Sequence, residues 1–396
     1  MANGPRPAFV TGPAVRLAVY TDYTYRRQDG AIYAERAFAL FLGRLSELLG
    51  SMLVVGKVHP ESGRARYPLP RTTEFVELPY YPSLAQPLSA FTAMVRSVVV
   101  FWRMLGRVDA VWLLGPHPLA LVFGLLAALR RKSVCLGVRQ DFPDYVRARH
   151  PTTRWLWVSA DALEYAWRAL ARKMPMVAVG PVLASHYPPA NTLEMSVSLI
   201  EEADIAPPEV EYRRAYEGPL QILSVGRLET EKNPLLLPSI AKLLLEDGRD
   251  WRLLICGEGS EAGELVKQCH ALGVADHVDL LGYVTHDAGL RELYRESHAL
   301  LHVSWTEGVP QVLFEAFAAR LPVVATAVGG VEAVASGAAL LVPPGDAIAA
   351  AEMLRRLCAD ATLRRELTDV GVERARNATV AIEVQRVAEF LRRRLQ

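Results

Sequence analysis

Short apolar runs alternate with amphipathic stretches from one end of the chain to the other. In the first half, the apolar runs that predict strands lie at residues 15–22, 51–58, 74–80, 109–115, 132–138 and 176–180. Helical patterns separate most of them, at residues 31–49, 84–106, 118–131 and 154–173. This alternation predicts βαβ units and a parallel sheet.

The rhythm restarts after a polar, Pro-containing stretch, IAPPEVEYRRAYEGP, at residues 205–219. The apolar runs that follow lie at residues 220–227, 251–259, 277–284, 298–305, 322–326 and 338–345. We therefore predict an α/β protein with two Rossmann-like domains facing a cleft, an N-terminal one over residues 1–205 and a C-terminal one over residues 206–380. The last helix, over residues 381–396, could cross back to the first domain.

Composition supports this organisation. A chain of 396 residues suits two domains, and 51% hydrophobic residues suit large buried cores. We expect a cytoplasmic protein, because the four cysteines form no Cys-x-x-Cys pair and read as reduced thiols. We expect neither a signal peptide nor a membrane span, since apolar runs such as LALVFGLLAAL fall short of the roughly 20 residues that a span needs.

Charge is distributed unevenly. Residues 1–205 carry 23 Lys and Arg against 16 Asp and Glu. This excess would suit an acidic ligand or anionic lipid, although solvated surface arginines explain it equally well. The helix over residues 118–131 ends in Arg130, Arg131 and Lys132, so peripheral contact with the inner membrane face stays open beside the plainer interpretation as a packed helix.

Polar residues follow several strands of the second half, where ligands of open parallel sheets bind. Arg227 and Lys232 come after LQILSV and are two cations suited to a diphosphate. Glu307 comes after HALLHVSW, and Glu315 follows in the next predicted helix. Two carboxylates at different depths suit recognition of hydroxyl groups better than metal chelation. The alternative is that both are ordinary solvated acids.

The turn between the two glutamates predicts an anion site. Gly308 permits a tight turn, and Pro310 suits the first turn of the helix that VLFEAFAARL predicts. The free backbone amides at such a helix start attract an anion, most naturally a phosphate.

Several of these segments are familiar together. VGRLETEKN, GEG, LLGYV and the pattern S-W-T-EG-V-P-x4-EA-x-A-x2-L-PVVAT-x-VGG-V resemble the donor-binding domain of retaining GT-B glycosyltransferases of family 4. The resemblance covers residues 220–345 and weakens towards the amino terminus. It implies a retaining hexosyltransferase that needs no metal ion or other cofactor and uses a nucleotide-sugar donor, of the UDP or GDP type. Consistently, no Asp-x-Asp motif occurs in the chain.

The resemblance also implies roles for single residues. Arg227 and Lys232 would hold the diphosphate, Glu307 would bind hydroxyls of the transferred sugar, and Glu315 would bind the ribose. The turn after Glu307, formed by Gly308, Val309 and Pro310, would cradle the distal phosphate. Gly257, Tyr283 and Val284 would border the base. Pro310 has no N–H and cannot donate to a phosphate.

The first half departs from that family. Gly30 precedes a predicted helix and stands where members carry a Gly-rich loop; a simple turn at a helix start is the alternative. Gln140 stands where members carry a histidine facing the reacting sugar. Either Gln140 supplies a neutral hydrogen bond, or Arg139 or His117 serves instead; we favour Gln140, with Asp141 nearby.

No motif in the sequence identifies the acceptor. A small molecule, a glycan or a lipid-linked acceptor all fit, and no nucleic acid is expected. Arginines in the first-half loops make an acidic or phosphorylated acceptor a hypothesis, with Arg139, Asp141 and Arg147 as candidate contacts; the loop arginines are Arg26, Arg27, Arg64, Arg66, Arg71, Arg147 and Arg149. Two other functions stay open: a GT-B phosphorylase or epimerase, and a non-catalytic partner subunit.

Overall fold

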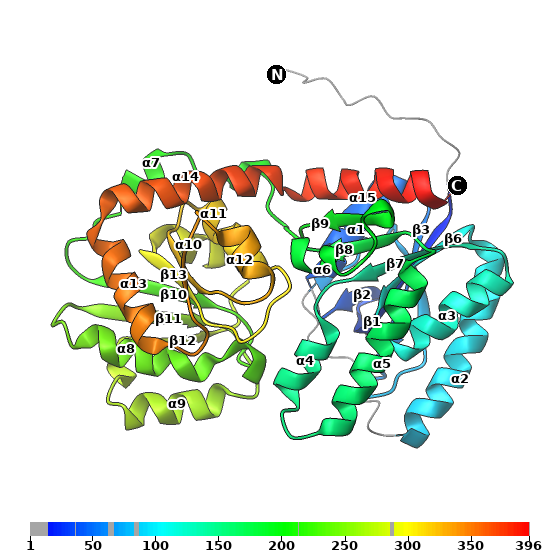
Figure 1. The fold of residues 1–396 in the computed structure, drawn as a ribbon, viewed down its shortest axis with the longest axis horizontal. Helices are drawn as coiled ribbons and strands as arrows, with labels where there is room; N and C mark the ends of the chain where they lie inside the picture. The colour runs from blue at the N-terminus through cyan, green and yellow to red at the C-terminus, as the bar shows by residue number, and fades with distance from the viewer. Residues whose placement is uncertain are drawn as a thin grey trace, which may run out of the picture. The chain divides into compact units, whose positions relative to one another are not determined.

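Two β-sheets with mostly parallel strands organise the chain in the computed structural model (Figure 1). The structure describes residues 15–35, 37–61, 67–82, 87–212, 214–285 and 289–395. The strands of the first sheet are β1 (Leu17–Gln28), β2 (Ala31–Ala34), β3 (Met52–Val58), β4 (Tyr67–Pro68), β5 (Glu74–Leu78), β6 (Ala110–Gly115), β7 (Ser133–Val138), β8 (Met176–Val179) and β9 (Thr192–Met195). The predicted alternation of strands and helices is thereby confirmed.

The first sheet runs in the order β4-β2-β1-β6-β7-β8-β9, and β3 and β5 extend it from β1. β1 is parallel to both β3 and β6, as expected for strands joined by helical crossovers. The helices of this part of the chain are α1 (Phe38–Leu49), α2 (Pro87–Met104), α3 (Pro118–Leu129), α4 (Phe142–Arg149), α5 (Arg154–Ala171) and α6 (Pro181–Ser185).

The stretch after the first strand corrects the prediction. β1 continues to Gln28 and pairs antiparallel with β2, where the sequence predicted a helix from residue 31. Asp29 and Gly30 form the connecting turn, with φ of 49° and 74°, because Asp-Gly favours the tight turn of a hairpin. α1 begins only at Phe38. Gly30 therefore lies in a hairpin turn and not at the start of a helix.

The second sheet has the order β12-β11-β10-β13-β14-β15, and its neighbouring strands all pair in parallel. Its strands are β10 (Leu220–Val225), β11 (Trp251–Cys256), β12 (Val278–Gly282), β13 (Ala299–His302), β14 (Val323–Thr326) and β15 (Leu340–Val342). All six lie within the predicted apolar runs. The predicted boundary at residues 205–219 lies between the last strand of the first sheet and the first strand of the second.

Helices of the second half follow from local signals. They are α7 (Glu209–Tyr212), α8 (Leu237–Leu245), α9 (Ala262–Ala271), α10 (Arg291–Glu296), α11 (Gln311–Ala318), α12 (Gly330–Ala335), α13 (Ala347–Ala359), α14 (Ala361–Asn377) and α15 (Val380–Leu395). Asp346 caps α13 by accepting from the amide of Ala349 at 2.9 Å, and Asp360 caps α14 by accepting from Leu363 at 2.9 Å. Such caps satisfy amides that a helix start leaves unpaired.

The chain divides into two compact units. One consists of residues 1–135 with residues 388–396, and the other of residues 136–387. Both β7 and α15 therefore contribute residues to each unit. In its first part, α15 holds the buried Glu383, whose carboxylate accepts from the amide of Ser196 at 3.2 Å. In its last part, Arg392 donates to the carbonyl oxygen of Leu48 at 3.1 Å.

Candidate functional site

The loop after β10 carries Arg227 and Lys232 and is held by close backbone contacts. Leu228 donates its amide to the carbonyl of Glu258 at 2.9 Å. Gly257 has φ of 154°, and a side chain there would place Cβ 1.8 Å from the carbonyl oxygen of Gly226. Only glycine fits this approach, so the GEG segment after β11 fixes the loop that bears both cations.

Glu307 is the most constrained acid of the site. Its Oε1 accepts a hydrogen bond from Lys232 Nζ and another from Ser304 Oγ at 2.7 Å. His302 Nε2 lies 3.1 Å from the same oxygen, but not in the direction of a hydrogen bond. Burial disfavours the charged form, yet Lys232 and His302 outweigh it and hold the pKa of Glu307 well below its usual range. The carboxylate is therefore ionised at neutral pH.

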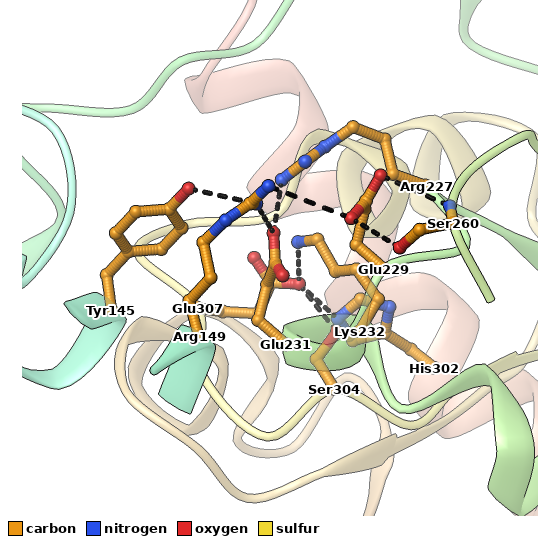
Figure 2. A network of polar contacts seen from close by, with 10 residues as sticks. All are labelled: Tyr145, Arg149, Arg227, Glu229, Glu231, Lys232, Ser260, His302, Ser304 and Glu307. Carbon is orange, nitrogen blue, oxygen red and sulfur yellow. Dashed lines mark hydrogen bonds and ion pairs between the residues drawn. The ribbon is translucent and has the colours of Figure 1, made fainter. Parts of the chain in front are cut away.

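Arg227 belongs to a second group of charges (Figure 2). Its Nη2 donates to Oε1 of the buried Glu231 at 2.8 Å, and Arg149 Nη1 of α4 lies 3.7 Å from the same oxygen. Figure 2 shows both guanidinium groups directed at Glu231, while the ammonium of Lys232 points to Glu307. Oε2 of Glu231 is buried with no hydrogen-bond partner among the described residues. Each of the two expected diphosphate ligands is thus paired with a buried carboxylate.

Arg149 connects this group to α4. Its Nη1 donates to the hydroxyl of Tyr145 at 3.2 Å, and its Nη2 lies 3.9 Å from Oε2 of Glu229. Ser260 Oγ in turn donates to that Glu229 oxygen at 3.0 Å. Burial lowers the pKa of Arg149, but Tyr145, Glu231 and Glu229 together raise it. This arginine is therefore a structural cation between two acids.

The turn before α11 is built by close packing. α11 begins at Gln311, and Pro310 is its N-cap residue, one position earlier than the predicted first turn. A Cβ on Gly308 would lie 2.6 Å from the carbonyl oxygen of Arg139, so glycine is needed for this approach rather than for a positive φ. Val309 is buried, and its side chain lies against Gly180 and Gly330.

Glu315 has a partner of its own. Its Oε2 accepts from the hydroxyl of Tyr294 at 2.7 Å, and Tyr294 is buried on α10. Burial, and then the nearby Glu315, raise the pKa of that tyrosine, which therefore stays a hydrogen-bond donor. Glu315 is half-buried on α11. The hydroxyl of Tyr294 on α10 thus helps to orient this carboxylate.

The predicted first-half contacts lie at the start of α4. Gln140 is exposed, and Asp141 caps α4 by accepting from the amide of Asp144 at 3.0 Å. Arg147 is paired with Asp161, with Nη2 2.7 Å from Oδ1. A cavity of about 470 Å³ brings Asp141 and Arg147 together with Glu307 and Gly308. These four predicted residues therefore line one space, whereas Arg227, Lys232 and Gln140 are not among the residues that line it.

The remaining predicted residues have simple positions. His117 is buried and caps α3, where its Nδ1 accepts from the amide of Leu119 at 3.2 Å. Tyr283 and Val284 follow β12 and are half-buried. Among the loop arginines proposed for an acidic acceptor, Arg64 and Arg66 lie outside the described residues. Arg27, Arg147 and Arg149 are paired with carboxylates, which leaves them less available to an anion.

Sequence reasoning missed the acids that pair with Arg227 and Arg149. Glu229 and Glu231 lie inside the quoted GRLETEKN segment, and their spacing beside Arg227 and Lys232 was the available signal. Arg149 carried no signal of its own role in this network. In the part of the chain that the structure describes, no three His, Cys, Asp or Glu side chains are placed to hold a metal ion. No described helix is long and apolar enough to cross a membrane.

Comparison with known proteins agrees with the second-half motifs. Residues 209–374 match the family described as Glycosyl transferases group 1. A D-inositol 3-phosphate glycosyltransferase of Corynebacterium diphtheriae is 33% identical over 171 residues, 41% of this chain and 40% of that protein. An exopolysaccharide phosphotransferase of Streptomyces coelicolor is 40% identical over 124 residues, 31% of this chain and 13% of that protein. The chain thus spans less than half the length of either relative.

Solved structures extend the likeness to nearly the whole chain. Anabaena HepE, crystallised in complex with UDP, superposes with a TM-score of 0.71 at 15% identity over 96% of this chain and 100% of HepE. At this identity the likeness shows the fold alone. The protein therefore has the GT-B fold, and its residues 209–374 match the glycosyl transferases group 1 domain.

Proposed function

We propose that the chain is a retaining glycosyltransferase that moves a sugar from a UDP- or GDP-sugar to an acceptor without a metal ion. One observation carries the proposal: Lys232 pairs with the ionised Glu307 and Arg227 with Glu231 after parallel strands, inside the region that matches the transferase domain. Two cations beside a carboxylate suit a ligand that joins a diphosphate to a polyhydroxylated sugar.

The two cations would stabilise the charge of the departing diphosphate. A metal-free site must supply this charge from side chains and helix starts, and fixed charges aimed at developing charge are the strongest such device. The diphosphate would compete with Glu231 for Arg227 and with Glu307 for Lys232. The amides that open α11 would add a partial positive charge.

Glu307 would bind the transferred sugar through its second oxygen. Lys232, Ser304 and His302 all contact Oε1 of its carboxylate, and Oε2 would accept from a sugar hydroxyl. Glu315 would bind the ribose. Gly257, Tyr283 and Val284 would border the base, and the acceptor oxygen would attack the face of the sugar that the diphosphate leaves.

A thermal-shift panel tests the donor. The chain is melted with UDP, GDP, ADP, TDP and NAD, with and without magnesium, since ligand binding to the folded state raises the melting temperature. We expect the melting temperature to rise with UDP or GDP but with none of the other compounds, and EDTA should not remove this rise. Lys232→Ala should abolish the rise, whereas Lys242→Ala on the exposed side of α8 should keep it. A melting temperature that rises only with NAD, or only when magnesium is present, would contradict the proposal.

Gln140 is tested by turnover. Because it stands where a histidine would face the sugar, Gln140→Ala should reduce turnover about tenfold or more, the range of one positioned hydrogen bond. Its affinity for the nucleotide should stay unchanged. Gln385→Ala, an exposed glutamine on α15, is the control. Equal turnover in both variants would remove Gln140 from the site.

Catalysis and retention of the anomeric configuration are tested by analysing the reaction product. The anomeric proton of the product in an NMR spectrum reports whether the configuration of the donor is kept, and inversion would contradict the retaining assignment. A protein that binds a nucleotide but turns over no donor sugar would instead favour a non-catalytic GT-B subunit.

A further inference from the structure

We propose that the outer face of α2 and α3 docks on the surface of a lipid bilayer that carries anionic headgroups. The proposal does not depend on the proposed catalytic function. It rests on exposed apolar side chains, on their position along two packed helices, and on the cations beside them.

α2 exposes an apolar stripe. Phe91, Val95, Val99 and Trp102 are all exposed, and Phe91 has 67% of its surface accessible. Their spacing of four, four and three residues places them on one side of a helix. Single exposed apolar residues are ordinary, but a continuous stripe of large ones marks a contact surface.

α3 extends this stripe. Its sequence, PLALVFGLLAAL, has no polar side chain, and a helix that is apolar all round is normally buried. Leu125 and Leu129 nevertheless have 62% and 75% of their surface exposed, and Val122 lies on the same side. α2 and α3 pack against each other within one unit, and Figure 1 shows them side by side. The seven exposed side chains of the two helices are called the α2–α3 face below.

Cations border the α2–α3 face. The guanidinium of Arg130 lies 3.9 Å from the ring centroid of Trp102 and so joins the end of α3 to α2. Arg96 and Arg103 are exposed on α2, and Arg131 follows Arg130. Neither helix contains Asp or Glu. A cationic edge without acids complements anionic headgroups, and tryptophan beside arginine is typical of the boundary between lipid and water.

The geometry fits a helix pair that lies on a bilayer. α3 has 12 residues, which make a helix of about 18 Å against the roughly 30 Å of a hydrocarbon core. Contact would therefore be peripheral, with apolar side chains inserted at the headgroup level and arginines paired with phosphates. A second copy of the chain is the competing occupant, but it would bring the same cations against these cations.

Vesicle sedimentation tests the proposal. The full chain is mixed with vesicles of phosphatidylcholine and phosphatidylglycerol, and with vesicles of phosphatidylcholine alone. We expect sedimentation with the anionic vesicles that falls as salt rises, because headgroup attraction is screened. Leu125→Asp with Leu129→Asp should weaken the partition by about tenfold or more. Arg130→Gln with Arg131→Gln should reduce the salt dependence by about half, since Arg96 and Arg103 remain.

The matched control is Ile348→Asp. Ile348 on α13 has 63% of its surface exposed, as much as Leu125, but lies outside the α2–α3 face. The Ile348→Asp variant should bind vesicles as the parent chain does. Equal loss in Ile348→Asp, no binding by the parent, or equal binding to uncharged vesicles would overturn the proposal. The proposal would also be overturned if the parent chain were a dimer that bound no vesicles and that the leucine variants converted to monomers.

The outcome is separable from the proposed catalysis. The leucine and arginine variants should keep the melting temperature and the nucleotide response of the parent chain, because all four changed side chains are exposed. If Leu125→Asp with Leu129→Asp fails to fold, Leu125→Gln alone replaces it, and its unchanged vesicle binding would count against the α2–α3 face.

Discussion

At the scale of single residues, the site is a set of paired charges. Lys232 and Glu307 form one pair and Arg227 and Glu231 another, and both acids are buried. Pairs of this kind orient a cation before its ligand arrives, but they also compete with the ligand. The affinity for the proposed donor should therefore depend on the acids as well as on the cations.

The pair of Lys232 and Glu307 should be visible in stability. Removing one partner leaves a buried charge, so Lys232→Ala should lower the free energy of unfolding by about 3 kcal/mol. Urea denaturation of the purified chain measures this change. Lys232→Met with Glu307→Gln should recover part of it, since neither charge then remains unpaired. An equal loss in Lys242→Ala, an exposed lysine, would show that the effect is not the pair's.

At the scale of elements, the loops after the strands set the site. The loop that carries Arg227 and Lys232 is positioned by the GEG segment. Its two glycines have no side chain, so the two backbones can approach each other closely. α4 places Arg149, and α10 places Tyr294. Each contact couples one functional side chain to an element distant in the sequence.

Gly257 tests that coupling. In Gly257→Ala the new Cβ would meet the Gly226 carbonyl, so the loop must move. We expect a loss of about 2 kcal/mol or more in stability and a weaker response to the nucleotide. Gly263→Ala is the control, because it lies in α9 with nothing within 4 Å of its Cβ and should be neutral or slightly stabilising. Similar effects of both changes would contradict the close approach.

The cap of α3 predicts a pH dependence. Nδ1 of His117 accepts from Leu119, so its Nε2 carries the proton and lies 3.2 Å from the hydroxyl of Tyr81. Burial lowers the pKa of His117 to about 4. The unfolded chain binds this proton more readily, so the stability present above the ordinary pKa is lost as pH falls towards 4. Between pH 7 and pH 5 the loss should be about 2 kcal/mol.

Denaturation at the two pH values measures this dependence. His117→Gln should be less stable than the parent at pH 7 but should lose less on acidification. His270→Gln, an exposed histidine on α9, should keep the slope of the parent. A parent slope that His117→Gln leaves unchanged would mean that another group titrates.

The elements were more predictable than the site. All six strands of the second sheet lie within runs that the apolar pattern marks, because buried parallel strands are continuous apolar segments. The hairpin after β1 was missed, since the polar Tyr-Thr-Tyr-Arg-Arg stretch shows no such run and only Asp-Gly signals the turn. The cluster of Arg149 with Glu229 and Glu231 could not be predicted, because distant contacts between charged residues leave no periodicity.

At the scale of the whole molecule, α15 belongs to both units. Its buried residues Leu391 and Leu395 contribute to the core of the first unit, and Val384 and Val387 to the second. A change late in this helix should therefore be felt by residues from the first part of the chain.

Leu391→Ala measures this dependence. Leu391 is buried, and truncating a buried leucine costs about 2–5 kcal/mol. The melting temperature of the chain should fall accordingly, and hydrogen exchange should increase in β1, β3 and β6. Arg393→Ala, an exposed neighbour, should change neither. Loss of protection confined to α15 itself would contradict this role.

The same division has a consequence for synthesis on the ribosome. The first unit is made of residues 1–135 and residues 388–396, so its two pieces are translated with the whole of the second unit between them. A nascent chain that has reached residue 387 holds a first unit still lacking its final helical segment. Its apolar surface therefore stays open to chaperones during most of translation, and a ribosome stalled before residue 388 would present that surface for as long as the stall lasts.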